Sequence, residues 1–277
     1  MRNLLLATAA LFALTAPAYA QDTSGGEEEP YEGVYVGGSF GYSIQGNDVG
    51  ESVVFDRNRD GNFNDTITTV AGANAFSPGF CNGRATSALP GNCTNDDDGI
   101  EYYVRAGADT QFGNIVLGFV GEFGKSEVRD SVSAFSTTPA NYVFTRELDW
   151  NASIRARAGY AANTTLFYGT FGPTYGRIDN SFTSTNTANA FSDNGKSNSW
   201  GYTAGGGIEQ KLGRNFSVGL EYLYTDLNED DYVVNVNPGT APATNPFLLG
   251  NAGGSDMRRS SDNFRWHSIR ATAAFRF

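Results

Sequence analysis

Several stretches of the chain alternate between apolar residues and polar or small ones. In residues 100–109 the even positions are Ile, Tyr, Val, Ala and Ala, whereas the odd positions include Glu101 and Arg105. Residues 148–160 and 200–209 have the same two-residue period, with mostly apolar residues at even positions. Because successive side chains of a β-strand point to opposite faces, this pattern predicts strands with one apolar and one polar face.

Three short turn-like segments begin at Gln111, Ala161 and Lys211, at a spacing of 50 residues. Each lies between two alternating stretches and therefore predicts a tight hairpin turn. The pattern predicts eight strands in all, over residues 34–44, 100–109, 115–123, 148–160, 166–178, 200–209, 218–224 and 269–277. The other four connections are long, at about 55, 18, 20 and 35 residues, so we expect long loops on one rim and short turns on the other.

The apolar rows carry aromatic residues near their ends, as at Trp150 and Tyr160 and at Trp200 and Tyr202. Such aromatic ends suit a bilayer with two interfaces, whereas a soluble sandwich, the alternative, turns its apolar face inward. The opposite rows hold small and charged residues, which fill the narrow interior of an eight-stranded barrel. The sequence therefore predicts an all-β fold: an eight-stranded antiparallel up-and-down transmembrane β-barrel with long extracellular loops and short periplasmic turns.

The first 20 residues have the form of a secretory signal peptide, with one basic residue, an apolar run and an A-x-A site ending at Ala20. We expect cleavage there, an acidic periplasmic tail over residues 21–32 and a barrel over residues 33–277. No other stretch approaches the run of about 20 apolar residues that a transmembrane helix needs. The 20 Phe and 14 Tyr supply too much apolar surface for a disordered chain.

The row expected to face the interior holds charges of both signs. Its members are Glu101, Arg105, Asp109, Glu122, Arg155, Arg157, Glu209, Glu221 and Arg270. Because an isolated buried charge is very costly, we expect these side chains to pair across the lumen and close the barrel. A narrow, low-conductance porin is the alternative function, in which a rotamer change opens a polar path. The mixed signs predict no strongly ion-selective ring.

Residues 56–65 fit the first half of a calcium-binding loop, D-x-[DN]-x-[DN]-G. The candidate ligands are Asp56, Asn58, Asp60, Asn62, Asn64 and Asp65. Position 12 of such a loop is Ile67 instead of a bidentate Glu, and no helices flank it, so an Asx-rich surface turn competes with this interpretation. Calcium is the one cofactor that the sequence suggests, and a calcium-stabilised adhesin or lattice-forming surface protein is a second alternative function.

The two cysteines, Cys81 and Cys93, lie in the long loop 45–99. Export places them in an oxidising compartment, so we expect a disulfide that contributes about 3 kcal/mol of local order. No basic cluster or His accompanies them, which disfavours a metal site or a catalytic thiol. The single histidine, His267, adjoins Ser268, but neighbouring strand residues face opposite sides and cannot form a nucleophile–base pair, so no enzyme activity is expected.

Four segments resemble the small outer-membrane β-barrel proteins of Gram-negative bacteria, a porin-like family that shares the eight-stranded architecture of the OmpA membrane domain. They are residues 33–38 (GVYVGG), 200–209 (WGYTAGGGIE), 221–227 (EYLYTDL) and 274–277 (AFRF). The resemblance implies an outer-membrane location, contact with lipid and lipopolysaccharide, and insertion by the barrel-assembly machinery, for which Phe277 is the signal.

We therefore expect a non-enzymatic surface protein that contributes to envelope structure and surface interaction. The net charge of −11 argues against a nucleic-acid partner. Arg258 and Arg259 are candidates for contact with lipopolysaccharide phosphates, although two arginines are also ordinary on a loop surface. The sequence leaves open a lateral homo-oligomer.

Overall fold

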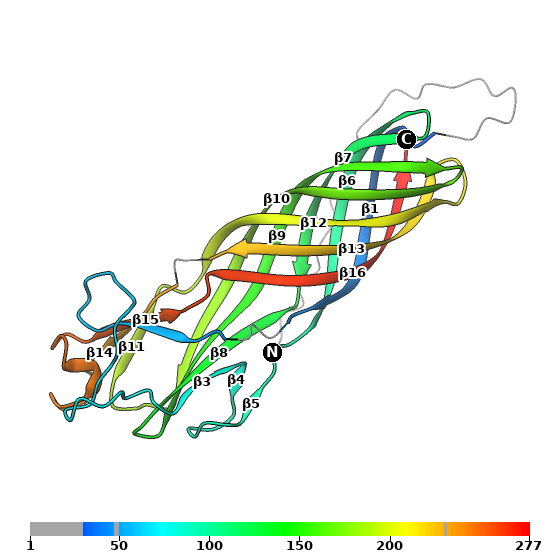
Figure 1. Cartoon of the computed structure of the whole chain (residues 1–277). Coiled ribbons are helices and arrows are strands. Elements are labelled where there is room, and N and C mark those ends of the chain that lie inside the picture. Colours follow the sequence, from blue (N-terminus) through cyan, green and yellow to red (C-terminus); the bar gives the residue numbers. More distant parts are fainter. Residues whose placement is uncertain (1–29, 47–49, 230–231) are drawn as a thin grey trace, which may run out of the picture.

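The computed structural model describes residues 30–46, 50–229 and 232–277, so the signal peptide and most of the acidic tail lie outside the described residues. Eight long strands form a barrel (Figure 1). They are β1 (Gly33–Ile44), β6 (Gly99–Phe112), β7 (Ile115–Ser126), β9 (Ala140–Ala162), β10 (Thr165–Ser184), β12 (Ser197–Lys211), β13 (Phe216–Asn228) and β16 (Asn263–Arg276). Every strand expected from the alternation is present, and each is longer than expected. Within the described residues, no helix is long and apolar enough to cross a bilayer.

The eight strands pair antiparallel in chain order, and β16 returns to pair with β1. The predicted up-and-down barrel is therefore confirmed. Closure leaves the spanning part without a free edge, so its backbone N–H and C=O groups can bond between strands, which the bilayer requires. Tight turns join β6 to β7, β9 to β10 and β12 to β13 at one rim, here the turn end, where the C-terminus also lies (Figure 1). The opposite rim is the loop end.

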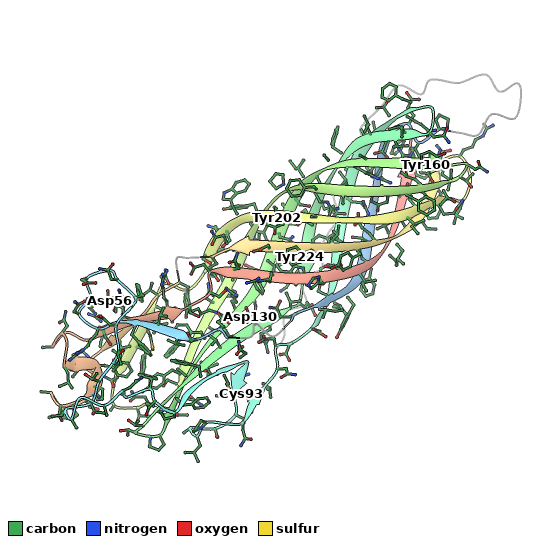
Figure 2. The ribbon with its side chains drawn as sticks, viewed as in Figure 1. Asp56, Cys93, Asp130, Tyr160, Tyr202 and Tyr224 are labelled. Carbon is green, nitrogen blue, oxygen red and sulfur yellow. A yellow bond between two sulfur atoms is a disulfide. The ribbon has the colours of Figure 1, made fainter. Side chains whose placement is uncertain are left out.

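The barrel strands are apolar on the outside and charged on the inside. Phe40 is 60% exposed and Val104 63%, whereas Glu101 is fully buried. Tyr160 lies near the turn end, and Tyr202 and Tyr224 lie nearer the loop end (Figure 2). Aromatic side chains at two levels match the two interfaces of a bilayer.

The long connections form ordered β-structure beyond the loop end, here called the loop sheets. The barrel sheet continues along β9 and β10 and gains β8 (Arg129–Ser136) and β3 (Gly79–Asn82). A second sheet has the order β11 (Ala190–Asp193), β14 (Val234–Asn237), β15 (Ser255–Arg259) and β2 (Val53–Asp56). A hairpin of β4 (Arg84–Ala85) and β5 (Cys93–Thr94) and a 3-10 helix, η1 (Pro246–Leu248), complete them. A buried aromatic cluster that includes Phe55, Phe76, Tyr142 and Phe247 packs them together.

In β9 the alternation of inward and outward side chains shifts by one residue near the loop end. Trp150 pairs with Arg177 but Leu148 pairs with Ile178, so Asp149 is an extra residue at a bulge. A bulge reverses the alternation beyond it. The expectation that Leu148 shares the lipid-facing row of Trp150 is therefore wrong, because Leu148 is buried in the interior.

Candidate functional site

The interior side chains form ionic and apolar layers along the barrel axis. The lower ionic layer, nearest the turn end, holds Asp109, Arg157, Glu209 and Arg276; the middle one holds Glu101, Arg105, Glu122, Arg155, Glu221 and Arg270; the upper one holds Glu51, Asp130, Arg146, Glu229 and Arg259. All nine charges expected in the lumen lie in the lower and middle layers, and none is more than 6% exposed.

Three arginines face three glutamates in the middle ionic layer, so its formal charge is zero. Glu122 contacts all three arginines: its carboxylate oxygens lie 2.9 Å from Arg155 Nη2, 3.2 Å from Arg270 Nη1 and 3.4 Å from Arg105 Nε. Glu221 lies 3.5–3.7 Å from the same three guanidinium groups. Such sharing lets each charge offset the desolvation of its neighbours, which a single buried pair does poorly.

Glu101 completes the middle ionic layer through hydroxyl groups. Ser43 and Ser268 donate hydrogen bonds to its Oε2 at 2.9 and 2.8 Å, and Arg270 Nε lies 3.5 Å from Oε1. Charge-assisted hydrogen bonds of this kind stabilise a buried carboxylate. These hydrogen bonds join the three neighbouring strands β16, β1 and β6.

The lower ionic layer includes a residue that sequence reasoning missed. Arg276 Nη2 lies 2.8 Å from Asp109 Oδ2, which is also 3.3 Å from Arg157 Nη1. Arg157 bonds to Glu209 and stacks its guanidinium 4.0 Å from the ring centre of Tyr168. Arg276 lies six residues after Arg270 on the same strand, and residues an even number of positions apart share a face. The alternation therefore places Arg276 inside with Arg270.

Tyr31 closes the turn end, although the expected boundary put it in the solvated tail. Its side chain is fully buried, and its hydroxyl group donates to the Thr164 carbonyl at 2.7 Å. Its backbone N–H donates to Gln111 Oε1 at 2.6 Å, and the Lys211 ammonium lies 4.9 Å from its ring centre. The aromatic ring of Tyr31 fills the end of the lumen, and the domain boundary at residue 32 stays a prediction.

An apolar layer separates the middle and upper ionic layers. Its members are Val128, Leu148, Ile178, Leu227, Phe264 and Trp266. Trp266 is among the largest fully buried side chains of the described residues. A packed apolar layer offers hydrated ions no polar groups, so it opposes conduction more strongly than the charged layers do.

The upper ionic layer joins the long connections to one another. Arg259 donates to both carboxylate oxygens of Glu51 at 2.7 and 2.6 Å and to Asp130 Oδ1 at 2.8 Å. Arg146 donates to Asp130 Oδ2 at 2.7 Å. Burial opposes ionisation of Asp130, but the two guanidinium groups outweigh it and lower its pKa. The expectation that Arg259 contacts lipopolysaccharide is wrong, because its charge is buried and paired.

Asp96 lies beside the upper ionic layer. Its Oδ1 accepts the backbone N–H of Ser131 at 2.7 Å. Burial, with the charges of Asp130 and Glu51 nearby, raises the pKa of Asp96 to about 7. The group therefore changes charge near neutral pH, in contrast to an exposed aspartate.

The calcium-like segment forms hydrogen-bonded turns. Asp56 accepts the backbone N–H groups of Asp60 at 3.1 Å and Gly61 at 2.7 Å, one with each carboxylate oxygen. The side-chain oxygens of Asn58, Asp60 and Asp65 likewise accept N–H groups of residues 60, 62 and 57. Among the described residues, no group of three or more His, Cys, Asp or Glu side chains is placed to hold a metal. The geometry favours the Asx-rich turn, and the calcium site stays a prediction.

The two other sequence-derived sites lie apart from the ionic layers. Cys81 and Cys93 form the predicted disulfide, which ties β3 to the β4–β5 hairpin (Figure 2). His267 lies on the outer face, with Nδ1 2.6 Å from the Tyr222 hydroxyl group, while Ser268 points inward to Glu101. His267 and Ser268 therefore do not meet as a nucleophile and its base.

The model of the outer membrane protein beta-barrel domain family matches residues 6–277. The chain belongs to this family. It is an outer-membrane protein, in contact with membrane lipid through its apolar outer rows. It is 35% identical over 132 residues to the 31 kDa outer-membrane immunogenic protein of Brucella melitensis, over 47% of this chain and 55% of that protein. It is also 35% identical over 129 residues to the 22 kDa outer membrane protein of Rhizobium leguminosarum bv. viciae, over 47% and 53%.

These matches span about half the length of the curated relatives. Among solved structures, the outer membrane protease OmpT from Escherichia coli aligns over 90% of this chain and 98% of its own, with 10% identity and a TM-score of 0.41. At that distance the likeness carries no inference about activity.

Proposed function

We propose that this outer-membrane protein is a closed, non-enzymatic barrel that anchors the loop sheets at the cell surface and contributes to envelope structure and surface interaction. The observation that carries the proposal is the filled lumen, in which ionic and apolar layers follow one another from Tyr31 to Arg259. A barrel of eight strands leaves little room beyond its own side chains.

The loop sheets support the second half of the proposal. They bury an aromatic cluster of their own. Arg259 pairs with Glu51 and Asp130 in the long connections, and Arg146 of β9 joins Asp130 to a barrel strand. A surface held in one conformation loses little entropy when it binds a partner. We place it outside the cell, with Phe277 at the periplasmic rim as the assembly signal.

The absence of enzyme activity belongs to the proposal as well. The sole histidine of the chain faces the lipid side and bonds to Tyr222. The inward carboxylates are buried and paired with arginines, so a substrate does not reach them.

Planar-bilayer recording tests the closed barrel. The wild-type protein is expected to show no discrete conductance steps. A variant that combines Arg155→Ala, Glu221→Ala and Trp266→Ala removes a neutral charge pair and the largest apolar plug, and is expected to conduct. Ile269→Ala, on the lipid face of the same region, is the matched control. Discrete conductance steps of any size from the wild-type barrel would reject the proposal, and small steps would support the narrow-porin alternative.

A further inference from the structure

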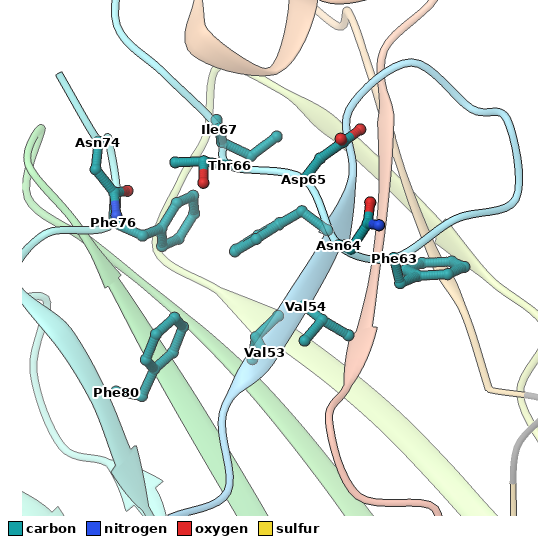
Figure 3. Close-up of a pocket in the computed structure, with 11 residues that line it drawn as sticks. Val53, Val54, Phe63, Asn64, Asp65, Thr66, Ile67, Asn74, Phe76 and Phe80 are labelled. Carbon is teal, nitrogen blue, oxygen red and sulfur yellow. The ribbon is translucent and has the colours of Figure 1, made fainter. Parts of the chain in front are cut away.

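A pocket of about 190 Å³ opens between β2 and β3, where the two loop sheets end in edge strands (Figure 3). Phe76, Phe80 and Asn74 lie on one side of it, Phe63 and Asn64 on the other. It is smaller than the roughly 300 Å³ at which pockets for drug-sized ligands begin, so it suits a single ring.

The floor of the pocket is aromatic and held in place. The rings of Phe55 and Phe76 are both buried, with their centres 4.5 Å apart. Phe76 in turn packs against Tyr142 at 5.2 Å and Phe247 at 5.8 Å. Phe80 adds a wall that is 41% exposed and therefore accessible to a ligand. Phe55 and Phe76 therefore form a rigid base, and Phe80 presents the ring face that a ligand can reach.

Polar groups ring the mouth above this floor. Asn74 Oδ1 accepts the backbone N–H of Phe76 at 2.8 Å, which fixes the amide and leaves its NH₂ group for a ligand. Asp65 Oδ2 accepts the Arg57 N–H at 2.9 Å, which leaves Oδ1 as an acceptor. The side chain of Thr66 adds an exposed hydroxyl group.

Arg258 and Asp65 bring one charge of each sign to the pocket, so its lining favours neither a cation nor an anion. The Arg258 guanidinium lies 4.7 Å from the ring centre of Phe63 and already occupies that face, so a second cation meets its repulsion. The carboxylate of Asp65 disfavours an anion at the mouth. A neutral ligand that has one apolar face and polar groups around its edge therefore fits the pocket best.

We propose that this pocket binds one neutral pyranose unit of a glycan, with its C–H face against the exposed ring of Phe80 and its hydroxyl groups at Asn74, Thr66 and Asp65. The site deepens the proposed surface interaction and rests on the loop sheets facing outward. Conductance recording tests the closed barrel independently of sugar binding, so either proposal can fail while the other holds.

Saturation-transfer NMR on the full chain in lipid nanodiscs, with the methyl α-pyranosides of glucose, mannose and galactose as probes, tests the site. At least one probe is expected to receive saturation, mainly at the C–H protons of one ring face. Phe80→Ala and Thr66→Val are expected to weaken its binding about tenfold each, because each removes a contact worth about 1.4 kcal/mol. Leu89→Ala changes another exposed apolar residue, which lies outside the pocket, and is the matched control.

Two further binding experiments distinguish the possible sources of such a sugar. Polysaccharide released from the producing cells represents the protein's own envelope, and neutral oligosaccharides absent from those cells represent a foreign surface. Binding of either, lost in Phe80→Ala, supports the site. The inference is overturned if none of the probes binds, if choline or glucuronate binds more tightly, or if Phe80→Ala and Thr66→Val bind like the wild-type protein.

Discussion

Replacing Arg259 by alanine removes the central cation of the upper ionic layer. The guanidinium donates twice to Glu51, once to Asp130 Oδ1 and once to the Asp130 carbonyl at 3.2 Å. Both carboxylates stay buried after the change, and among the described residues only Asp130 keeps another charged partner, in Arg146. Leaving a buried charge unpaired costs about 3–5 kcal/mol, so we expect the opening free energy of the loop sheets to fall by that amount.

Backbone hydrogen exchange measures this opening, with the spanning parts of β6 and β7 as an internal reference. Because 1.4 kcal/mol corresponds to a factor of ten, protection in β2, β8 and β15 should fall by about 2 to 3.6 orders of magnitude. The spanning strands should keep their protection, since their lower and middle ionic layers are unchanged.

Arg258→Ala is the matched control. The side chain of Arg258 is 31% exposed and lies 3.9 Å from Asp262, so its loss should cost less than about 1 kcal/mol. The double change Arg259→Met with Glu51→Gln should restore part of the protection, because it removes the unpaired carboxylate too. Equal exchange in Arg259→Ala and Arg258→Ala would refute the reasoning.

Three further outcomes follow from other parts of the molecule. The pKa of Asp96 is raised from 3.8 to about 7 in the folded state, so the hydrogen-exchange protection of the loop sheets should decline as the pH rises from 3.8 to about 7. Asp96→Asn should abolish this decline. A decline that persists in the variant would show that another group causes it. The double change Cys81→Ser with Cys93→Ser should lower the local stability of the β3–β5 region by about 3 kcal/mol, seen as faster proteolysis there alone. Tyr31→Ala should lower the stability of the barrel by about 3–5 kcal/mol, measured by thermal unfolding in detergent, whereas Glu32→Ala should have no effect. Equal unfolding midpoints for the two variants would contradict the role of Tyr31 in closing the turn end.

The spanning part of the fold was predictable because the bilayer imposes a simple rule. Lipid on the outside and packed side chains on the inside require a two-residue period in every strand, as in residues 100–109. The same period placed Glu101, Arg105 and Glu122 inside, and it also marked Arg276, which the prediction overlooked.

The sequence by itself therefore determined the eight spanning strands, their tight turns, the side of the nine expected lumen charges and the proximity of the two cysteines, since these depend on local period and spacing. Only the tertiary structure decided that Leu148 turns inward at a bulge, that Arg259 is buried beside Glu51, and that β2 and β3 leave a pocket. Glu51 and Arg259 are 208 residues apart in the chain, and no local pattern carries information about such a pair. It forms because the long connections share one apolar core, whose packing brings distant charges within reach of each other.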